Sequence, residues 1–410
     1  MKKIVLLIAV FVSVVTALVV VGNKDLRKHP DARIVQYDSD GIDEPLRELA
    51  AIRGLIFGSQ FRPEDLTTDA KYEDIFLREF GLAVPGNNFK MRHLQAQRGS
   101  FDFATTDLIM DYAHEHDLEI HGHALIYGWP KWVDFTEWTR DDLIAFVKEH
   151  VRTVVTRYKG RVRSWDVVNE AFCLKADAGG TCILDESGTA GMDPTVWRKV
   201  IGPEFIEIAL REARAADPNA QLYINENGTE LLGPKSDALY VFVKDLKARG
   251  VPLDGVGFQM HIPLEAYQYM KYPSRQTGSM RNATVPEGTP TTTEQLQSNI
   301  AQNFQRFNDL GLDVLITELD VAIPKTWKSP SKQELADQAE VFASLLQLCL
   351  GAESCPSFTI WGFNDKYSWI PRAKPRYDHA TPFDEELEPK PAYHAMKRVL
   401  SEWSPEPATE

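Results

Sequence analysis

Basic residues are scarce in this chain of 410 residues, which holds 45 Lys and Arg against 59 Asp and Glu, a formal charge of −14. An acidic surface repels phosphate backbones, so we expect no nucleic-acid partner. The chain also lacks long linkers and low-complexity tracts between Leu46 and Trp403. Its 43% hydrophobic and 25% charged residues are ordinary for a globular protein. This composition excludes a mostly disordered chain, a collagen-like chain and a protein that crosses a membrane many times.

The N-terminus combines two lysines with an uncharged apolar run from Ile4 to Gly22. This pattern predicts a secretory signal peptide over residues 1–22. The run is close in length to a membrane span and lacks an A-x-A cleavage site, so an uncleaved N-terminal membrane anchor is the alternative. In both cases we expect a secreted, extracellular protein or one anchored to the outside of the membrane. Residues 23–45 are predicted to be a polar spacer and residues 404–410 a tail.

Cysteine is scarce as well, with four residues in two close pairs, Cys173 with Cys182 and Cys349 with Cys355. In an exported protein this spacing predicts two short-loop disulfides. Zinc is an alternative, but CxxC spacing and a nearby His cluster are both missing, and free thiols are a further alternative. We therefore expect no metal.

Short apolar runs alternate with longer amphipathic stretches in the body of the chain. The expected strands are Leu55–Gly58, Leu82–Val84, Glu119–Leu125, Val162–Val168, Gln221–Ile224, Gly255–Gln259, Asp313–Thr317 and Phe358–Phe363. The expected helices are 104–117, 140–158, 203–216, 235–249, 294–310 and 332–350. Such alternation predicts a parallel sheet buried on both faces, and eight units favour an α/β fold with a single (β/α)8 TIM barrel over residues 46–403. A doubly wound sheet is the alternative, but the Gly-rich turn typical of it is missing after the first strand.

Polar and ionisable residues gather where the expected strands end. These are Asn87 and Lys90, His121 and His123, Asn169 and Glu170, Gln259 and His261, Glu318 and Asp320, and Trp361 and Asp365. Because the carboxyl ends of barrel strands meet on one face, we expect these side chains to form one site.

Two glutamates, Glu170 and Glu318, directly follow the fourth and seventh expected strands. Glycoside hydrolysis needs two carboxyl groups, one to protonate the leaving oxygen and one to attack the anomeric carbon or activate water. Strands four and seven lie nearly opposite across an eight-stranded barrel, so the two side chains can face each other over its mouth. Asn169 could bind a sugar hydroxyl, and His261 could orient or tune Glu318.

At this point the motifs resemble glycoside hydrolase family 10, the retaining endo-β-1,4-xylanases, from about Leu46 to Trp403. The segments that carry the resemblance are GNNFKM, RGSFDF, HGHALIYGWPKW, WDVVNEA, GVGFQMH, ITELDV, WGFNDKYSW and PFDEELEPKPAY. The resemblance implies that Glu170 is the acid/base and Glu318 the nucleophile. It also implies a substrate-binding set, namely Asn87, Lys90, His123, Tyr127, Asn169, Gln259, His261, Trp361 and Trp369. The pair Cys349 and Cys355 matches a disulfide common in the family.

The chain departs from the family pattern on the side of the cleft that holds the non-reducing end of the substrate. Gly86 stands where the family has Glu, Tyr127 stands where it has Trp, and the following His-Ser-Gln is shortened. The family motif NDYN is changed to Asn-Glu-Asn at 225–227, and the run 262–290 is longer than usual.

The resemblance therefore implies an endo-β-1,4-xylanase that hydrolyses internal bonds of xylan and needs no cofactor. We expect the protein to be a monomer. Its partner is a polysaccharide, xylan or a related β-1,4-glycan. The departures leave two alternatives open, a glycosidase of the same fold with another β-linked substrate and a polysaccharide-binding barrel without catalysis.

Overall fold

The computed structural model describes residues 43–133, 137–173, 191–192, 196–266, 293–326 and 329–404. The predicted export segment, nearly all of the spacer and the tail beyond residue 404 lie outside these ranges. Cys182 and most of the run 262–290 lie outside them as well. In the described part of the chain, no helix has the length and apolarity that a membrane crossing requires.

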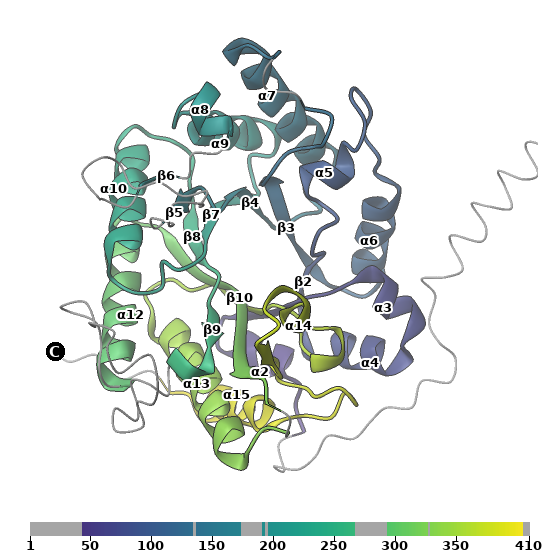
Figure 1. Cartoon of the computed structure of the whole chain (residues 1–410), viewed down its shortest axis with the longest axis vertical. Helices are drawn as coiled ribbons and strands as arrows, with labels where there is room; N and C mark the ends of the chain where they lie inside the picture. The colour runs from purple at the N-terminus through teal and green to yellow at the C-terminus, as the bar shows by residue number, and fades with distance from the viewer. Residues whose placement is uncertain are drawn as a thin grey trace, which may run out of the picture.

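Eight parallel strands close into a barrel, which confirms the predicted TIM-barrel fold (Figure 1). In barrel order they are β1 (Ile56–Gln60), β2 (Leu82–Val84), β3 (Glu119–Ile126), β4 (Ser164–Asn169), β7 (Gln221–Glu226), β8 (Gly255–Phe258), β10 (Asp313–Pro324) and β11 (Ser357–Ile360). The barrel closes because β11 pairs in parallel with both β1 and β10. Each expected strand is present, although some ends differ.

Helices surround the strands in Figure 1 and cover the outside of the barrel. The main ones are α4 (Ala70–Glu79), α6 (Ala104–Glu115), α7 (Arg140–Arg157), α9 (Phe205–Ala216), α10 (Pro234–Ala248), α12 (Thr293–Asn308), α13 (Lys332–Gly351) and α15 (Pro391–Glu402). Shorter elements are α2 (Leu46–Ile52), α3 (Pro63–Thr68), α5 (Met91–Leu94), α8 (Val196–Val200), α14 (Ile370–Ala373), the 3-10 helix η3 (Asp365–Tyr367), β5 (Phe172–Cys173), β6 (Gly191–Met192), β9 (His261–Pro263) and β12 (Tyr377–Asp378). The six predicted helices are confirmed with small shifts at their ends.

Two of the longest helices begin with a capping box. At the start of α7, the Thr139 hydroxyl accepts the Asp142 N–H, and the Asp142 carboxylate accepts the Thr139 N–H. Ser331 and Glu334 form the same reciprocal pair at the start of α13. These side chains satisfy backbone donors that have no partner within the helix, so both helices start at defined residues.

The hydrophobic core lies between the barrel and its helices, where aromatic rings interlock. Phe57 of β1 stacks on Phe80 and on Phe358 of β11, with ring centroids 5.8 Å and 5.5 Å apart. Strands such as β4 are buried along their whole length. Polar side chains inside the barrel, such as Asp166 and Asn225, are buried too.

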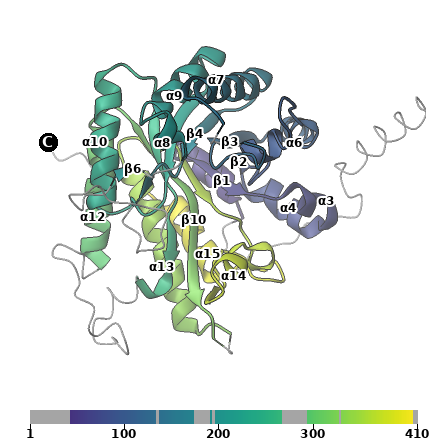
Figure 2. The same cartoon turned by 45° about the horizontal axis from the view of Figure 1, so that its top comes forward.

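The seventh barrel strand is longer than predicted. We expected it to end at Thr317, with Glu318 following it, but β10 continues to Pro324 and so contains both Glu318 and Asp320. Beyond the barrel it pairs with β9 and β12, and Figure 2 shows it running on beside the segment with α14. Its register with β11 shifts between Ile316 and Leu319. Such an irregularity re-aims side chains, and here it falls at Glu318.

Candidate active site

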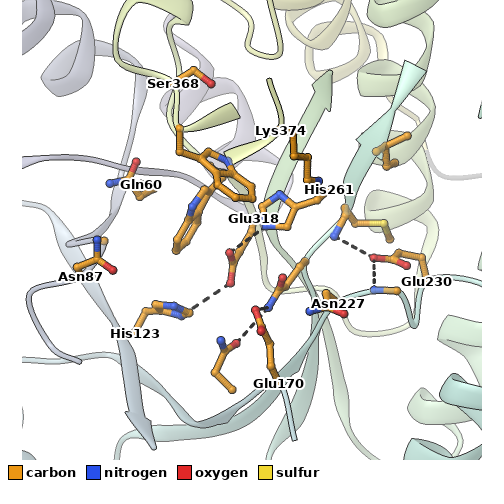
Figure 3. A pocket seen from close by; sticks show the side chains of 18 of the residues that line it. Gln60, Asn87, His123, Glu170, Asn227, Glu230, His261, Glu318, Ser368 and Lys374 are labelled. Atoms are coloured by element: carbon orange, nitrogen blue, oxygen red, sulfur yellow. Dashed lines mark hydrogen bonds and ion pairs between the residues drawn. The ribbon is translucent and has the colours of Figure 1, made fainter. Parts of the chain in front are cut away.

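One cleft of about 1250 Å³ opens where the barrel strands end. Every predicted catalytic and substrate-binding residue lines it, and Figure 3 shows the Glu170 and Glu318 side chains pointing toward one another. The structure thus brings together residues from six barrel strands and their loops. Of the predicted strand-end residues, His121, Asp320 and Asp365 do not line the cleft, although His121 lies beside Asp166 and Asp320 beside His261. Asp365 is buried at the start of η3 and pairs with Lys390, so its expected place in the site was wrong.

Glu318 is almost fully buried and has three polar neighbours. Its Oε1 accepts a hydrogen bond from Asn225 Nδ2 at 2.7 Å, and His123 Nδ1 lies 3.8 Å from the same oxygen. Its Oε2 lies 3.2 Å from His261 Nε2. Burial alone would raise the pKa of this carboxyl, but His123 and His261 outweigh burial and lower it. Glu318 is therefore held as a carboxylate, the form that a nucleophile needs.

His261 is fixed between two carboxylates. Its Nδ1 lies 2.8 Å from Asp320 Oδ2, which also accepts the indole N–H of Trp369 at 2.9 Å. Burial lowers the pKa of His261, but the charges and hydrogen bonds of Asp320 and Glu318 raise it to about 10. The ring is thus an imidazolium at neutral pH, donating one proton to each carboxylate.

Glu170 follows β4 at a sharp turn in the backbone. Its φ of 56° lies in the left-handed region, which turns its side chain into the cleft. Gln259 Nε2 donates to Glu170 Oε1 at 3.0 Å. Burial and the charge and hydrogen bond of Glu170 raise the pKa of Tyr127, so this phenol remains a donor to the carboxylate.

An amide network joins the two carboxylates. Asn225 Nδ2 donates to both Glu318 Oε1 and Asn169 Oδ1, the latter at 2.9 Å. Gln259 Nε2 donates to Glu170 and also lies 3.2 Å from Asn169 Oδ1. Thr317 Oγ1 donates to Asn225 Oδ1 at 2.7 Å and so fixes which end of that amide faces the site. The network can hold both carboxylates in place before substrate binds.

Below the two carboxylates lies a buried cluster of Asp166, His121 and His123. The sequence did not predict that these three side chains contact one another. Asp166 of β4 lies 2.7 Å from His123 Nδ1 and 3.0 Å from His121 Nε2. Burial opposes its ionisation, but the two histidines lower its pKa to about 2. Over the described ranges, no cluster of three or more His, Cys, Asp or Glu side chains is arranged to hold a metal ion.

The rim of the cleft combines cations, amides and aromatic rings. Lys90 Nζ lies 4.8 Å from the centre of the Tyr127 ring, and burial lowers its pKa. Asn87 Oδ1 accepts a hydrogen bond from Arg92 at 3.2 Å. Trp361 and Trp369 pack edge-on against His123 and His261, with ring centroids 5.1 Å and 4.9 Å apart. Flat ring faces beside hydrogen-bonding groups suit a chain of sugars.

Gly86 lies at this rim with a left-handed φ of 47°. A Cβ atom there would come within 2.7 Å of Gln60 Nε2, which donates to the Phe61 carbonyl at 2.7 Å. Gln60, which we had not predicted as a site residue, lines the cleft and fills the space beside Gly86.

Cys349 and Cys355 form a disulfide between α13 and β11, as predicted. Cys173 is the last residue of β5, but the other predicted pair cannot be followed because Cys182 lies outside the described residues.

Known proteins similar to this chain are glycoside hydrolases, which agrees with the pair of carboxyl groups in the cleft. The model of glycosyl hydrolase family 10 matches residues 45–284 and 289–399. Endo-1,4-beta-xylanase B of Thermotoga neapolitana is 33% identical over 88% of this chain and 92% of its own length. Endo-1,4-beta-xylanase C of Phanerodontia chrysosporium is 34% identical over 87% of this chain and 79% of its own. The crystal structure of xylanase 10B from Thermotoga petrophila in complex with xylobiose has a TM-score of 0.73 and 34% identity, covering 88% of this chain and 98% of that one.

Proposed function

The chain belongs to glycosyl hydrolase family 10, and we propose that it is a retaining endo-β-1,4-xylanase. The main support for this mechanism is the arrangement of two carboxyl groups. Glu318 is a buried carboxylate held ionised by His261, and Glu170 points at it across the same cleft. This is the pair that double displacement requires.

In the first step, Glu318 attacks the anomeric carbon while Glu170 donates a proton to the glycosidic oxygen that leaves. In the second step, Glu170 accepts a proton from water, which attacks the same carbon and releases Glu318. The hydrogen bond from Asn225 orients the carboxylate of Glu318, and that from Gln259 orients the carboxylate of Glu170, in both steps.

The substrate is xylan or a xylo-oligosaccharide. The xylobiose complex of the Thermotoga petrophila relative supports this choice, as does the cleft lined by Trp361, Trp369, Asn87 and Lys90. We further propose that the protein acts outside the cytoplasm, which the Cys349–Cys355 disulfide and the apolar N-terminal run support.

A substrate panel combined with product stereochemistry tests the proposal. Xylan, mannan, β-glucan and aryl β-glycosides are incubated with the full chain, and the first reducing sugars are followed by proton NMR. We expect cleavage of xylan with the β-anomer appearing first. An α-anomer as first product would contradict the double displacement. Strong glucan cleavage without xylan cleavage would assign the site to another β-linked substrate instead.

A further inference from the structure

Behind Glu170 lies a second carboxylate that does not line the cleft. Glu226, the last residue of β7, is fully buried. Its Oε1 accepts two backbone N–H groups, those of Ala171 and Phe172, the latter at 2.9 Å. These two residues directly follow Glu170, so this side chain is bonded to the backbone that carries the acid/base.

The backbone at this point needs support. Glu170 has a φ of 56°, a conformation that residues with a side chain rarely adopt and that persists only where neighbouring contacts fix it. The N–H of Glu170 donates to the Asn225 carbonyl at 2.9 Å. Three successive N–H groups, at residues 170, 171 and 172, are therefore bound by two successive residues of β7, Asn225 and Glu226.

Lys235 holds Glu226 from the other side. Its Nζ lies 3.0 Å from Glu226 Oε2, and it also donates to the carbonyl of Asn227 at 2.6 Å. Lys235 is only 4% exposed and stands in the first turn of α10, where a positive charge opposes the helix dipole. Neither burial nor the helix favours a lysine at this place, so its pairing with Glu226 accounts for its position.

Glu226 is electrostatically coupled to Glu170. Burial raises the pKa of Glu226 to about 7, Lys235 and the Phe172 N–H oppose that rise, and the negative charge of Glu170 adds to it. Glu226 therefore lies within electrostatic reach of Glu170 although it cannot touch a substrate in the cleft.

We infer that Glu226, held by Lys235, is a positioning residue for the acid/base Glu170. Its carboxylate fixes the left-handed turn that aims Glu170 at the leaving oxygen. This inference rests on the proposed role of Glu170, so its test must separate a misplaced acid/base from a wrongly assigned one.

Leaving-group dependence provides that separation. Two aryl β-xylobiosides share their sugar part, but 2,4-dinitrophenolate leaves without protonation whereas phenolate needs an acid. Glu226→Ala removes the acceptor of both N–H groups. We expect kcat/KM for the phenyl substrate to fall about tenfold to a hundredfold, with that for the dinitrophenyl substrate almost unchanged. Glu226→Gln keeps an oxygen for the N–H groups but loses the ion pair, so its loss on the phenyl substrate should be smaller.

Asp365→Asn is the matched control. Asp365 is also buried, pairs with Lys390 at 2.9 Å and accepts the Thr381 N–H at 3.0 Å, but it does not line the cleft. We expect this variant to change kcat/KM for both substrates by the same factor. Loss of a buried ion pair alone would then not explain a difference between the two substrates.

The outcomes are distinct. An equal loss on both substrates in the Glu226 variants, or no loss on either, overturns the positioning role. If Glu226→Ala does not fold, the split in Glu226→Gln decides on its own. Glu170→Ala serves as the reference. If this variant shows no leaving-group split, the proposed function fails, whatever the Glu226 variants do.

Discussion

His261 Nε2 lies 3.2 Å from Glu318 Oε2, and the other nitrogen of the ring is bound to Asp320. A histidine can donate from both nitrogens only as an imidazolium. The pKa of about 10 for His261 and the lowered pKa of Glu318 are therefore two sides of one ion pair. The pair keeps Glu318 charged in a place where burial would otherwise neutralise it.

Replacing His261 should move the acid limb of the pH–rate profile. In His261→Asn the positive charge is gone, so the pKa of Glu318 rises and the limb of kcat/KM shifts to higher pH. A dinitrophenyl β-xylobioside is the right substrate because it needs no protonation. His114→Asn, at an exposed position of α6, is the control and should leave the limb in place. An unshifted limb in His261→Asn would contradict the ion pair.

The same pair should make stability depend on alkaline pH. The pKa of His261 is about 10 in the folded protein and 6.5 for the free side chain. A raised pKa means that the folded state holds the proton more tightly, so this stabilisation is complete below about pH 6.5 and disappears as the pH rises toward 10. Urea unfolding between pH 6 and 10 should show a falling free energy of unfolding, with a shallower fall in His261→Asn. Equal slopes in the two proteins would sink the idea.

Glu318→Gln should abolish turnover and leave the fold intact. The amide is isosteric but cannot form the glycosyl bond, so we expect kcat on xylo-oligosaccharides to fall by about 10⁴-fold or more. Circular dichroism and thermal unfolding check the fold. Glu115→Gln changes an exposed carboxylate at the end of α6 and should behave as the unmodified protein. Appreciable residual turnover in Glu318→Gln would remove Glu318 from the role of nucleophile.

The sequence was sufficient to predict the barrel because strands buried on both faces have a clear apolar pattern. Glu170 and Glu318 could be found because each stands at the mouth of such a strand. The roles of Asp166 and Asn225 could not be predicted, because their partners come from other strands and pairing in space leaves no trace in one sequence. The same holds for the role of Glu226, because its hydrogen bonds go to the backbone that follows β4.

The extension of β10 escaped because the apolar run stops at Thr317, while pairing with β9 and β12 continues the strand beyond it. Asp365 was placed in the site because it follows β11 closely, but it turns inward to Lys390. A residue that closely follows a strand in sequence can thus be assigned to one end of the barrel. The direction in which its side chain points cannot be predicted in this way.

Gly86→Ala should weaken both stability and substrate binding. The added Cβ must push Gln60 aside, and the alanine must adopt the left-handed φ of 47° that Gly86 has. Gly54→Ala is the matched control, with a φ of 74° and no atom within 4 Å of the added Cβ, so it isolates the backbone cost of about 1 kcal/mol. We expect Gly86→Ala to lose more stability than this and to raise KM for xylo-oligosaccharides about fivefold, the equivalent of one hydrogen bond of about 1 kcal/mol. Equal effects of both variants on stability and KM would show that Gln60 has no part in the site.

Replacing the pair Cys349 and Cys355 by alanine should lower stability without affecting catalysis. The cysteines are only six residues apart, and closing so short a loop restricts the unfolded chain by about 2 kcal/mol. The native loop keeps other support, since Asn308 Nδ2 donates to the Ser354 carbonyl at 3.1 Å and β11 stays paired with β1 and β10. Urea unfolding should therefore show a loss near this value, with kcat/KM unchanged. A large fall in kcat/KM would mean instead that the disulfide positions β11 and, through it, Trp361 at the cleft.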